Sequence, residues 1–212
     1  MAATAGEPPA QAAPTIAERE LSIAPKLGNP APLAVSGFAT SSFILGLYYT
    51  HLIGMGSLPL FFPVAFFFGG MIQVLVAILE VWNGNVFGAA VFGTYGSFWI
   101  ILAAINVWFA KMVKPASAVD PGLALFLACI AVVSFYLFLA TLKTDVVLAV
   151  VFALIVIALA LYVIAFDNPT STGLFKAAGW CTVVFAVLAW YHAAADIINF
   201  TFGRSVVPLG KL

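Results

Sequence analysis

Six long apolar stretches, separated by short polar breaks, constrain this chain more than any other feature. They cover about residues 31–52, 59–81, 86–110, 121–142, 145–166 and 174–199. Each is close to the ~20 residues that an α-helix needs to cross the hydrocarbon core of a bilayer. Because the breaks are short, neighbouring helices must run antiparallel. The sequence therefore predicts an all-α membrane protein with six transmembrane helices in one compact bundle.

Charged side chains are scarce. Hydrophobic residues make up 64% of the chain and charged residues 8%, whereas a soluble domain carries about 25% charged residues. Such a composition cannot cover a globular surface in water, so we expect a multi-pass protein of the cell membrane whose partner is the lipid bilayer. The formal net charge is zero, which argues against nucleic acid as a partner. Cys129 and Cys181 lie inside apolar runs without metal-ligand spacing, so we expect no metal and no cofactor.

Residues 1–28 differ from the rest of the chain because they are rich in Ala and Pro and lack a long apolar run. We expect a disordered N-terminal tail here, a transmembrane domain over residues 29–203 and a short C-terminal tail over residues 204–212. The distribution of Lys and Arg favours cytoplasmic termini, since five lie on the side of the termini and three on the other side. The five are Arg19, Lys26, Lys143, Arg204 and Lys211, and the three are Lys111, Lys114 and Lys176.

The segment Asn29-Pro30-Ala31-Pro32-Leu33 marks the start of the first span. Prolines remove hydrogen bonds inside a helix but fit its first turn, where the N–H groups have no partner in the helix. We therefore expect Asn29 as the N-cap and Pro30 as the first helical residue. Because a helix N-terminus carries a partial positive charge, it can face an anion, and Asn29 and Pro30 become candidate substrate-binding residues.

Polar residues inside the apolar spans are costly to insert into lipid and usually face the interior of a bundle. In this chain they include Ser42, Gln73, Glu80, Thr94, Ser97, His192 and Asp196. Helical spacing places those of one span on a shared face or beside one another, so we expect them to surround a mildly polar passage. The alternative is that each makes an interhelical hydrogen bond, which is worth ~0.6 kcal/mol on average in a membrane protein.

His192 and Asp196 lie one helical turn apart, and Glu80 ends the second span. A His–carboxylate pair can relay protons because His titrates near neutral pH, so these three residues are candidates for proton coupling. The alternatives are a structural ion pair for His192 and Asp196 and an interfacial position for Glu80. The chain contains no metalloprotease, nucleotide-binding or nucleophile motif, so we do not expect an enzyme.

Motifs along the chain resemble the signature of the acetate uptake transporter family, which contains succinate–acetate permeases and their fungal relatives. The resemblance begins with Asn29-Pro30-Ala31-Pro32-Leu33 and Gly37-Phe38 and covers about residues 27–210. The further motifs are Phe68-Gly69-Gly70 with Gln73 and Glu80, Gly84-Asn85-Val86-Phe87-Gly88, Thr94-Tyr95-Gly96-Ser97-Phe98-Trp99, Thr141-Leu142-Lys143, Ala178-Gly179-Trp180 and Phe202-Gly203-Arg204. The family continues with Gly-Leu after the first motif, where this chain has Ala34-Val35.

The resemblance implies a ring-shaped homo-hexamer with one pathway in each protomer and an apolar constriction of Phe, Tyr and Leu on the first, third and fifth spans. Phe38 and Tyr95 match the first two positions, and counting from Thr141 puts Ile155 at the third. Hydroxyls and amides must replace part of the hydration that a carboxylate loses in such a pore. The candidate donors are Ser42, Gln73, Asn85, Thr94 and Ser97.

The function expected from this resemblance is membrane transport of acetate and related short-chain carboxylates, with succinate as a further candidate substrate. Transport would take place through an anion channel or a proton-coupled symporter. Two alternatives remain open at this point. One is a channel for small neutral solutes, and the other is a non-transporting membrane scaffold or signalling subunit.

Overall fold

The computed structural model describes residues 28–210 and 212, and six helical stretches in this part of the chain are long and apolar enough to cross a membrane. They are Ala31–Tyr49, Met55–Trp82, Val86–Met112, Ala116–Thr141, Val146–Asp167 and Thr172–Phe202. The expected six-span architecture is therefore confirmed, with boundaries that differ from the expected ones by a few residues. Of the tail expected over residues 1–28, residues 1–27 lie outside the described residues.

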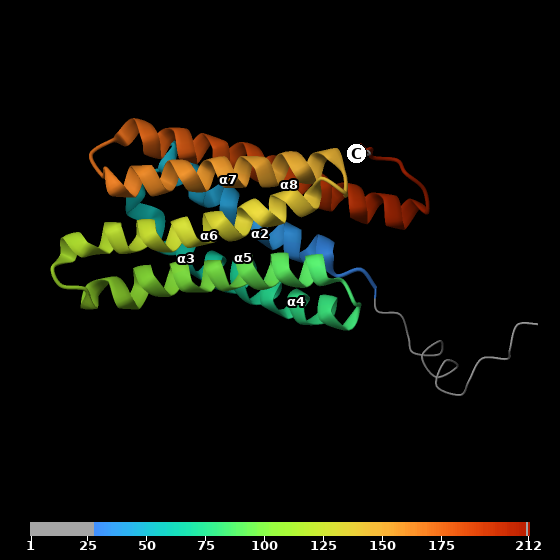
Figure 1. Cartoon of the computed structure of the whole chain (residues 1–212), viewed down its shortest axis with the longest axis horizontal. Coiled ribbons are helices and arrows are strands. Elements are labelled where there is room, and N and C mark those ends of the chain that lie inside the picture. Colours follow the sequence, from blue (N-terminus) through green and yellow to red (C-terminus); the bar gives the residue numbers. More distant parts are fainter. Residues whose placement is uncertain (1–27, 211) are drawn as a thin grey trace, which may run out of the picture.

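The helices lie along a common long axis and form one antiparallel bundle (Figure 1). Their bounds are α2 (Ala31–Tyr49), α3 (Phe61–Pro63), α4 (Ile72–Trp82), α5 (Val86–Ala104), α6 (Val119–Thr141), α7 (Val146–Asp167) and α8 (Thr172–Phe202). Helix α2 packs against α4, α5 and α8, and α7 packs against α6 and α8. Since the number of spans is even, α2 begins and α8 ends at the same end of the bundle, which we call the terminal end.

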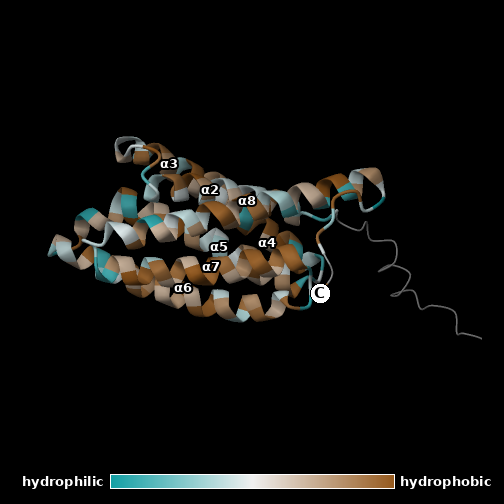
Figure 2. Cartoon of the chain, turned by 90° about the horizontal axis from the view of Figure 1, so that it is seen from above, coloured by the Kyte–Doolittle hydropathy of each residue, from teal (hydrophilic) through white to brown (hydrophobic). Residues whose placement is uncertain are grey.

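Apolar side chains cover much of the outside of the bundle, and hydrophilic residues gather mostly near the helix ends (Figure 2). Large exposed apolar residues include Leu125, Val132, Trp180 and Phe200. In water such a surface would be strongly unfavourable, whereas lipid tails accept it as long as the backbone polar groups are satisfied inside the helices. The exposed surface thus agrees with a multi-pass membrane protein.

The start of α2 differs by one residue from the expected one. The helix begins at Ala31, with Pro30 as its cap and Pro32 in its first turn. The Ala31 N–H donates to Asn29 Oδ1 at 3.0 Å, so the Asn29 side chain still satisfies one free donor of the helix start. The expectations that Asn29 is the N-cap and Pro30 the first helical residue are wrong by one position. Both prolines still lie where a missing N–H costs no helical hydrogen bond.

The second span contains a π-helical segment, Val64–Met71, which the sequence pattern did not predict. A π-helical turn widens the helix locally and shifts the direction of the side chains that follow it. Gly69 in this segment packs so closely that an added Cβ would collide with the Ser41 side chain of α2 and lie 3.1 Å from Cγ of Trp99 in α5. The segment therefore brings the second span into close contact with two neighbouring helices.

Two glycines set the distance between α2 and α8. A Cβ on Gly179 would lie 2.8 Å from the backbone nitrogen of Thr50 and 3.0 Å from the carbonyl oxygen of Gly46. A Cβ on Gly46 would lie 2.9 Å from the carbonyl oxygen of Gly179. Because lipid supplies no hydrophobic force between helices, such small residues are what permits close packing.

We predict that Gly179→Ala lowers the thermal stability of the detergent-solubilised protein, because overpacking costs about 1–3 kcal/mol. Gly173→Ala is the matched control on the same helix, since a Cβ at Gly173 meets no atom within 4 Å. Tryptophan fluorescence during heating measures both variants. Equal melting temperatures for Gly179→Ala and Gly173→Ala would contradict the prediction.

Candidate functional site: two cavities and the side chains between them

Two cavities lie inside the bundle. The larger has a volume of about 480 Å³ and is lined at the terminal end by Ala31, Asn85, Lys143 and other residues near helix ends; we call it the vestibule. The smaller has a volume of about 60 Å³, and we call it the inner cavity. It is lined by Tyr49 and Phe166, which lie near the C-terminal ends of α2 and α7, away from the terminal end. The two cavities therefore follow each other along the bundle axis.

Three side chains line both cavities, and they come from three different helices. They are Phe38 of α2, Tyr95 of α5 and Ile155 of α7. Each is at most 8% exposed, and the ring centroids of Phe38 and Tyr95 lie 5.2 Å apart. The structure thus brings together the three residues that the sequence predicted as neighbours, at the boundary between a wide space and a narrow one.

Tyr95 is held in place at this boundary by a hydrogen bond. Its hydroxyl donates to Oγ of Ser134 in α6 at 2.9 Å, and Ser134 is fully buried. The rings of Phe152 and Phe185 extend the aromatic group, since Phe152 lies 6.0 Å from Tyr95 and Phe185 lies 5.8 Å from Phe38. Sequence reasoning missed Ser134, because nothing in the pattern links α5 to a position 39 residues later.

The inner cavity has mainly apolar walls with a few hydroxyl and N–H groups. Oγ of Ser42 and Nε1 of Trp99 are buried and have no hydrogen-bond partner among the described residues. Both residues line this cavity. Buried donors without a partner are rare in folded proteins and commonly mark a place where water or a ligand binds. Ser42 was a predicted site residue, whereas Trp99 was named only as the last residue of a family motif.

The vestibule has a more polar lining. Gln73 is fully buried, its Nε2 donates to the Gly69 carbonyl oxygen at 2.5 Å, and its Oε1 has no partner in the described part of the chain. Asn85 is exposed and caps α5, because its Oδ1 accepts a hydrogen bond from the Gly88 N–H at 3.0 Å. Glu80 is 2% exposed and packs beside Gly88, behind the residues that line the vestibule.

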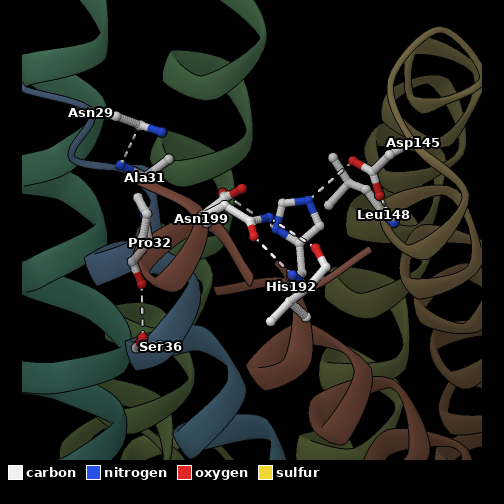
Figure 3. A network of polar contacts seen from close by, with 10 residues as sticks. Asn29, Ala31, Pro32, Ser36, Asp145, Leu148, His192 and Asn199 are labelled. Carbon is white, nitrogen blue, oxygen red and sulfur yellow. Dashed lines mark hydrogen bonds and ion pairs between the residues drawn. The ribbon is translucent and has the colours of Figure 1, made fainter. Parts of the chain in front are cut away.

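A cluster formed by Asp145, His192 and Asp196 also lines the vestibule. Figure 3 shows His192 of α8 beside Asp145 at the start of α7. Nε2 of His192 lies 3.1 Å from Oδ2 of Asp145, and its Nδ1 lies 3.6 Å from Oδ2 of Asp196, which is too long for a hydrogen bond. The sequence predicted the pairing with Asp196 but missed Asp145. The spacing along one helix reveals a partner four residues away, whereas Asp145 precedes His192 by 47 residues.

Four of the predicted substrate-binding residues do not line either cavity, and neither does Glu80. The four are Asn29, Pro30, Thr94 and Ser97. Ser97 is exposed and Thr94 is half-buried. A helix turns about 100° per residue, so Ser97, two positions after Tyr95, points away from the face that carries Tyr95. The prediction that these four contact a substrate in the passage receives no support from the geometry within one chain.

A six-helix membrane bundle with two cavities and an apolar boundary between them is compatible with a membrane transport protein, although a fold alone does not establish function. Comparison with known proteins makes the class specific. The chain matches the GPR1/FUN34/yaaH family over residues 15–210 and belongs to this family. This is the family of acetate and succinate transporters and channels that the sequence motifs resemble, and the expectation that the chain is not an enzyme is confirmed.

Individual relatives agree with this assignment. The chain is 33% identical over 186 residues to the succinate-acetate/proton symporter SatP of Escherichia coli K12, covering 88% of this chain and 97% of that protein. It is similar to a solved structure of the bacterial acetate channel SatP, with a TM-score of 0.80 and 31% identity over 87% of this chain and 100% of that one. It is also 31% identical over 176 residues to ammonia transport outward protein 2 of Saccharomyces cerevisiae, over 81% of this chain and 62% of that protein.

We predict that Ser134→Ala destabilises the protein by about 1–3 kcal/mol, because it leaves the buried Tyr95 hydroxyl without its acceptor. Tyr95→Phe in the same background removes that hydroxyl, so the double variant should be no less stable than Ser134→Ala alone. Unfolding of the four proteins in detergent measures the coupling between the two residues. If the losses of unfolding free energy in the two single variants simply add up in the double variant, the hydrogen bond is not the cause.

Proposed function

We propose that this chain transports acetate and related short-chain carboxylates, with succinate as a further candidate, along a pathway within each protomer. The pathway runs from the vestibule past Phe38, Tyr95 and Ile155 into the inner cavity. The observation that carries the proposal is that these three side chains, from three helices, line both cavities. A solute that moves between the cavities must pass them, so they act as the constriction.

The chemistry of the lining suits a small carboxylate. The methyl group of acetate needs only an apolar wall, which Phe38 and Ile155 provide. The carboxylate must exchange water for protein donors as it moves. The amide groups of Gln73 and Asn85 can serve it in the vestibule, and the Ser42 hydroxyl in the inner cavity. The Trp99 N–H is a further donor there, because it has no partner among the described residues.

Uptake of labelled acetate by proteoliposomes tests the transport function. We predict that Phe38→Ala widens the constriction and raises the uptake of butyrate relative to acetate by roughly tenfold, since steric discrimination of a few methylenes has about this size. Phe67→Ala is the matched control, because Phe67 is 60% exposed on the outer surface and lines neither cavity.

The same assay separates the alternatives. A membrane scaffold predicts that purified wild-type protein passes no acetate and that Phe38→Ala changes assembly without changing flux. A channel for neutral solutes is favoured by the similarity to a yeast protein named for ammonia transport and by the mainly apolar walls of the inner cavity. It predicts that ammonia passes faster than acetate, and that result would contradict the proposal.

Proton coupling is the second part of the proposal, with Glu80, His192 and Asp196 as the candidate residues. A proton-coupled symporter accumulates acetate when only a pH gradient is imposed, and Glu80→Gln and Asp196→Asn should reduce this accumulation. An anion channel instead follows the membrane potential, and its pH dependence should survive both substitutions. The two mechanisms are distinguished by measuring the uptake of labelled acetate under a pH gradient alone and under a membrane potential alone. Phe67→Ala again serves as the control.

For the organisation of the protein, we propose a transmembrane domain over residues 29–203, six copies in a ring and cytoplasmic termini. Lys143 and Arg204 lie at the terminal end, whereas Lys111, Lys114 and Lys176 lie near the opposite helix ends. Of the other cations that support the orientation, Arg19, Lys26 and Lys211 lie outside the described residues. Native mass spectrometry tests the number of copies, and protease accessibility of the N-terminus in oriented membranes tests the orientation.

A further inference from the structure

The vestibule gathers charged side chains from three parts of the chain. Lys143 comes from the turn between α6 and α7, Asp145 from the start of α7, and His192 and Asp196 from α8. With His192 neutral, these lining residues carry one net negative charge, because two carboxylates face one lysine. Glu80, the other acidic residue of this region, packs behind the lining beside Gly88. An anion that moves towards the constriction must therefore cross a vestibule whose net charge has the same sign as its own.

Hydrogen bonds hold the Asp145 carboxylate in place, whereas the Asp196 carboxylate lies beside His192 without a hydrogen bond to it. His192 is 8% exposed and lies between them, 3.1 Å from Asp145 and 3.6 Å from Asp196. Nδ1 of His192, which faces Asp196, has no hydrogen bond in the described part of the chain. The other oxygen of Asp145, Oδ1, accepts a hydrogen bond from the Leu148 N–H at 2.9 Å and so caps α7. Fixed charges shape the potential of a cavity more strongly than mobile ones, because they cannot move away from the ion.

The N-terminus of α7 does not offset this negative charge. The N–H groups of Val146 and Val147 each donate at 3.3 Å to carbonyl oxygens of residues 209–210, and the Leu148 N–H donates to Asp145. These are the groups that would otherwise attract an anion at a helix start. Because they already have partners, the side chains decide the charge of this part of the vestibule.

The C-terminal segment that provides these acceptors is itself fastened to α8. Asn199 Oδ1 accepts hydrogen bonds from the N–H groups of Val206 at 2.6 Å and Val207 at 2.8 Å. The Tyr191 hydroxyl donates to the Pro208 carbonyl oxygen at 2.6 Å. These hydrogen bonds fix the segment as part of the vestibule wall.

We propose that Asp145 and Asp196, on either side of His192, make the vestibule select singly charged carboxylates over doubly charged ones. The inference rests on the proposed transport of carboxylates. A negative potential lowers the local concentration of an anion by a Boltzmann factor, and the energy in that factor is proportional to the charge of the anion. A change that favours a monoanion by some factor must therefore favour a dianion by the square of that factor.

The experiment compares uptake of labelled acetate and labelled succinate at neutral pH, where succinate carries two negative charges, without a pH gradient or a potential. Asp196→Asn and Asp145→Asn each remove one charge, and Asn at position 145 keeps an oxygen that can cap α7. We expect acetate uptake to rise about threefold and succinate uptake about tenfold in each variant.

Lys143→Gln provides the opposite change in charge at an exposed position. It should lower acetate uptake about threefold and succinate uptake about tenfold, and it does not depend on the folding of the Asp variants. Asp167→Asn is the control, because Asp167 is exposed at the far end of α7 and lines neither cavity. It should leave the ratio of the two uptakes unchanged.

The outcomes separate this inference from the proposed function. Wild-type protein that takes up no acetate overturns the transport function itself. Wild-type protein that transports acetate, together with Asp and Lys variants whose succinate-to-acetate ratio stays within about twofold of wild type, overturns the selector alone. That second case includes the absence of detectable succinate uptake in every variant. Uptake that rises in the Asp variants and falls in the Lys143→Gln variant, with larger changes for succinate than for acetate, supports the selector.

Discussion

The close approach of α2 to its neighbours is the contact on which the rest of the structure depends. Lipid supplies no hydrophobic force between helices, so association relies on packing at small residues. Gly46 and Gly179 bring α2 against α8, and an added Cβ on Gly37 would collide with the Phe68 carbonyl oxygen of the second span. Phe38, next to Gly37, is thereby fixed at the bundle interior between the two cavities.

Much of this architecture was predictable from the sequence, and the reason is physical. Long apolar runs and short polar breaks determine the spans without reference to tertiary contacts. Contacts between helices were not predictable in the same way: Asp145 joins His192 from another helix, and Ser134 joins Tyr95 from α6. The π-helical segment of the second span also went unpredicted, because its cause is a change of hydrogen-bond register rather than a sequence motif.

In the proposed pathway, the polar and apolar parts of the passage have different tasks. The vestibule is wide and carries fixed charges, so it acts on a solute through its charge before any close contact. The constriction is narrow and built from rings and an aliphatic side chain, so it acts through size and loss of hydration. Acetate combines a single charge with a small apolar end and satisfies both requirements. The proposed division fits the arrangement of the lining, in which the charged residues lie in the vestibule and Phe38, Tyr95 and Ile155 lie deeper.

Chemical blocking at the boundary between the cavities tests whether the transport pathway runs through the single bundle. Ile155→Cys is introduced together with Cys129→Ala and Cys181→Ala, and a small anionic thiol reagent is added to proteoliposomes that take up labelled acetate. The reagent should abolish acetate uptake by the Ile155→Cys protein, excess acetate should slow the block, and the cysteine-free parent should be unaffected. Full modification of the cysteine with unchanged acetate uptake would contradict a pathway past Ile155.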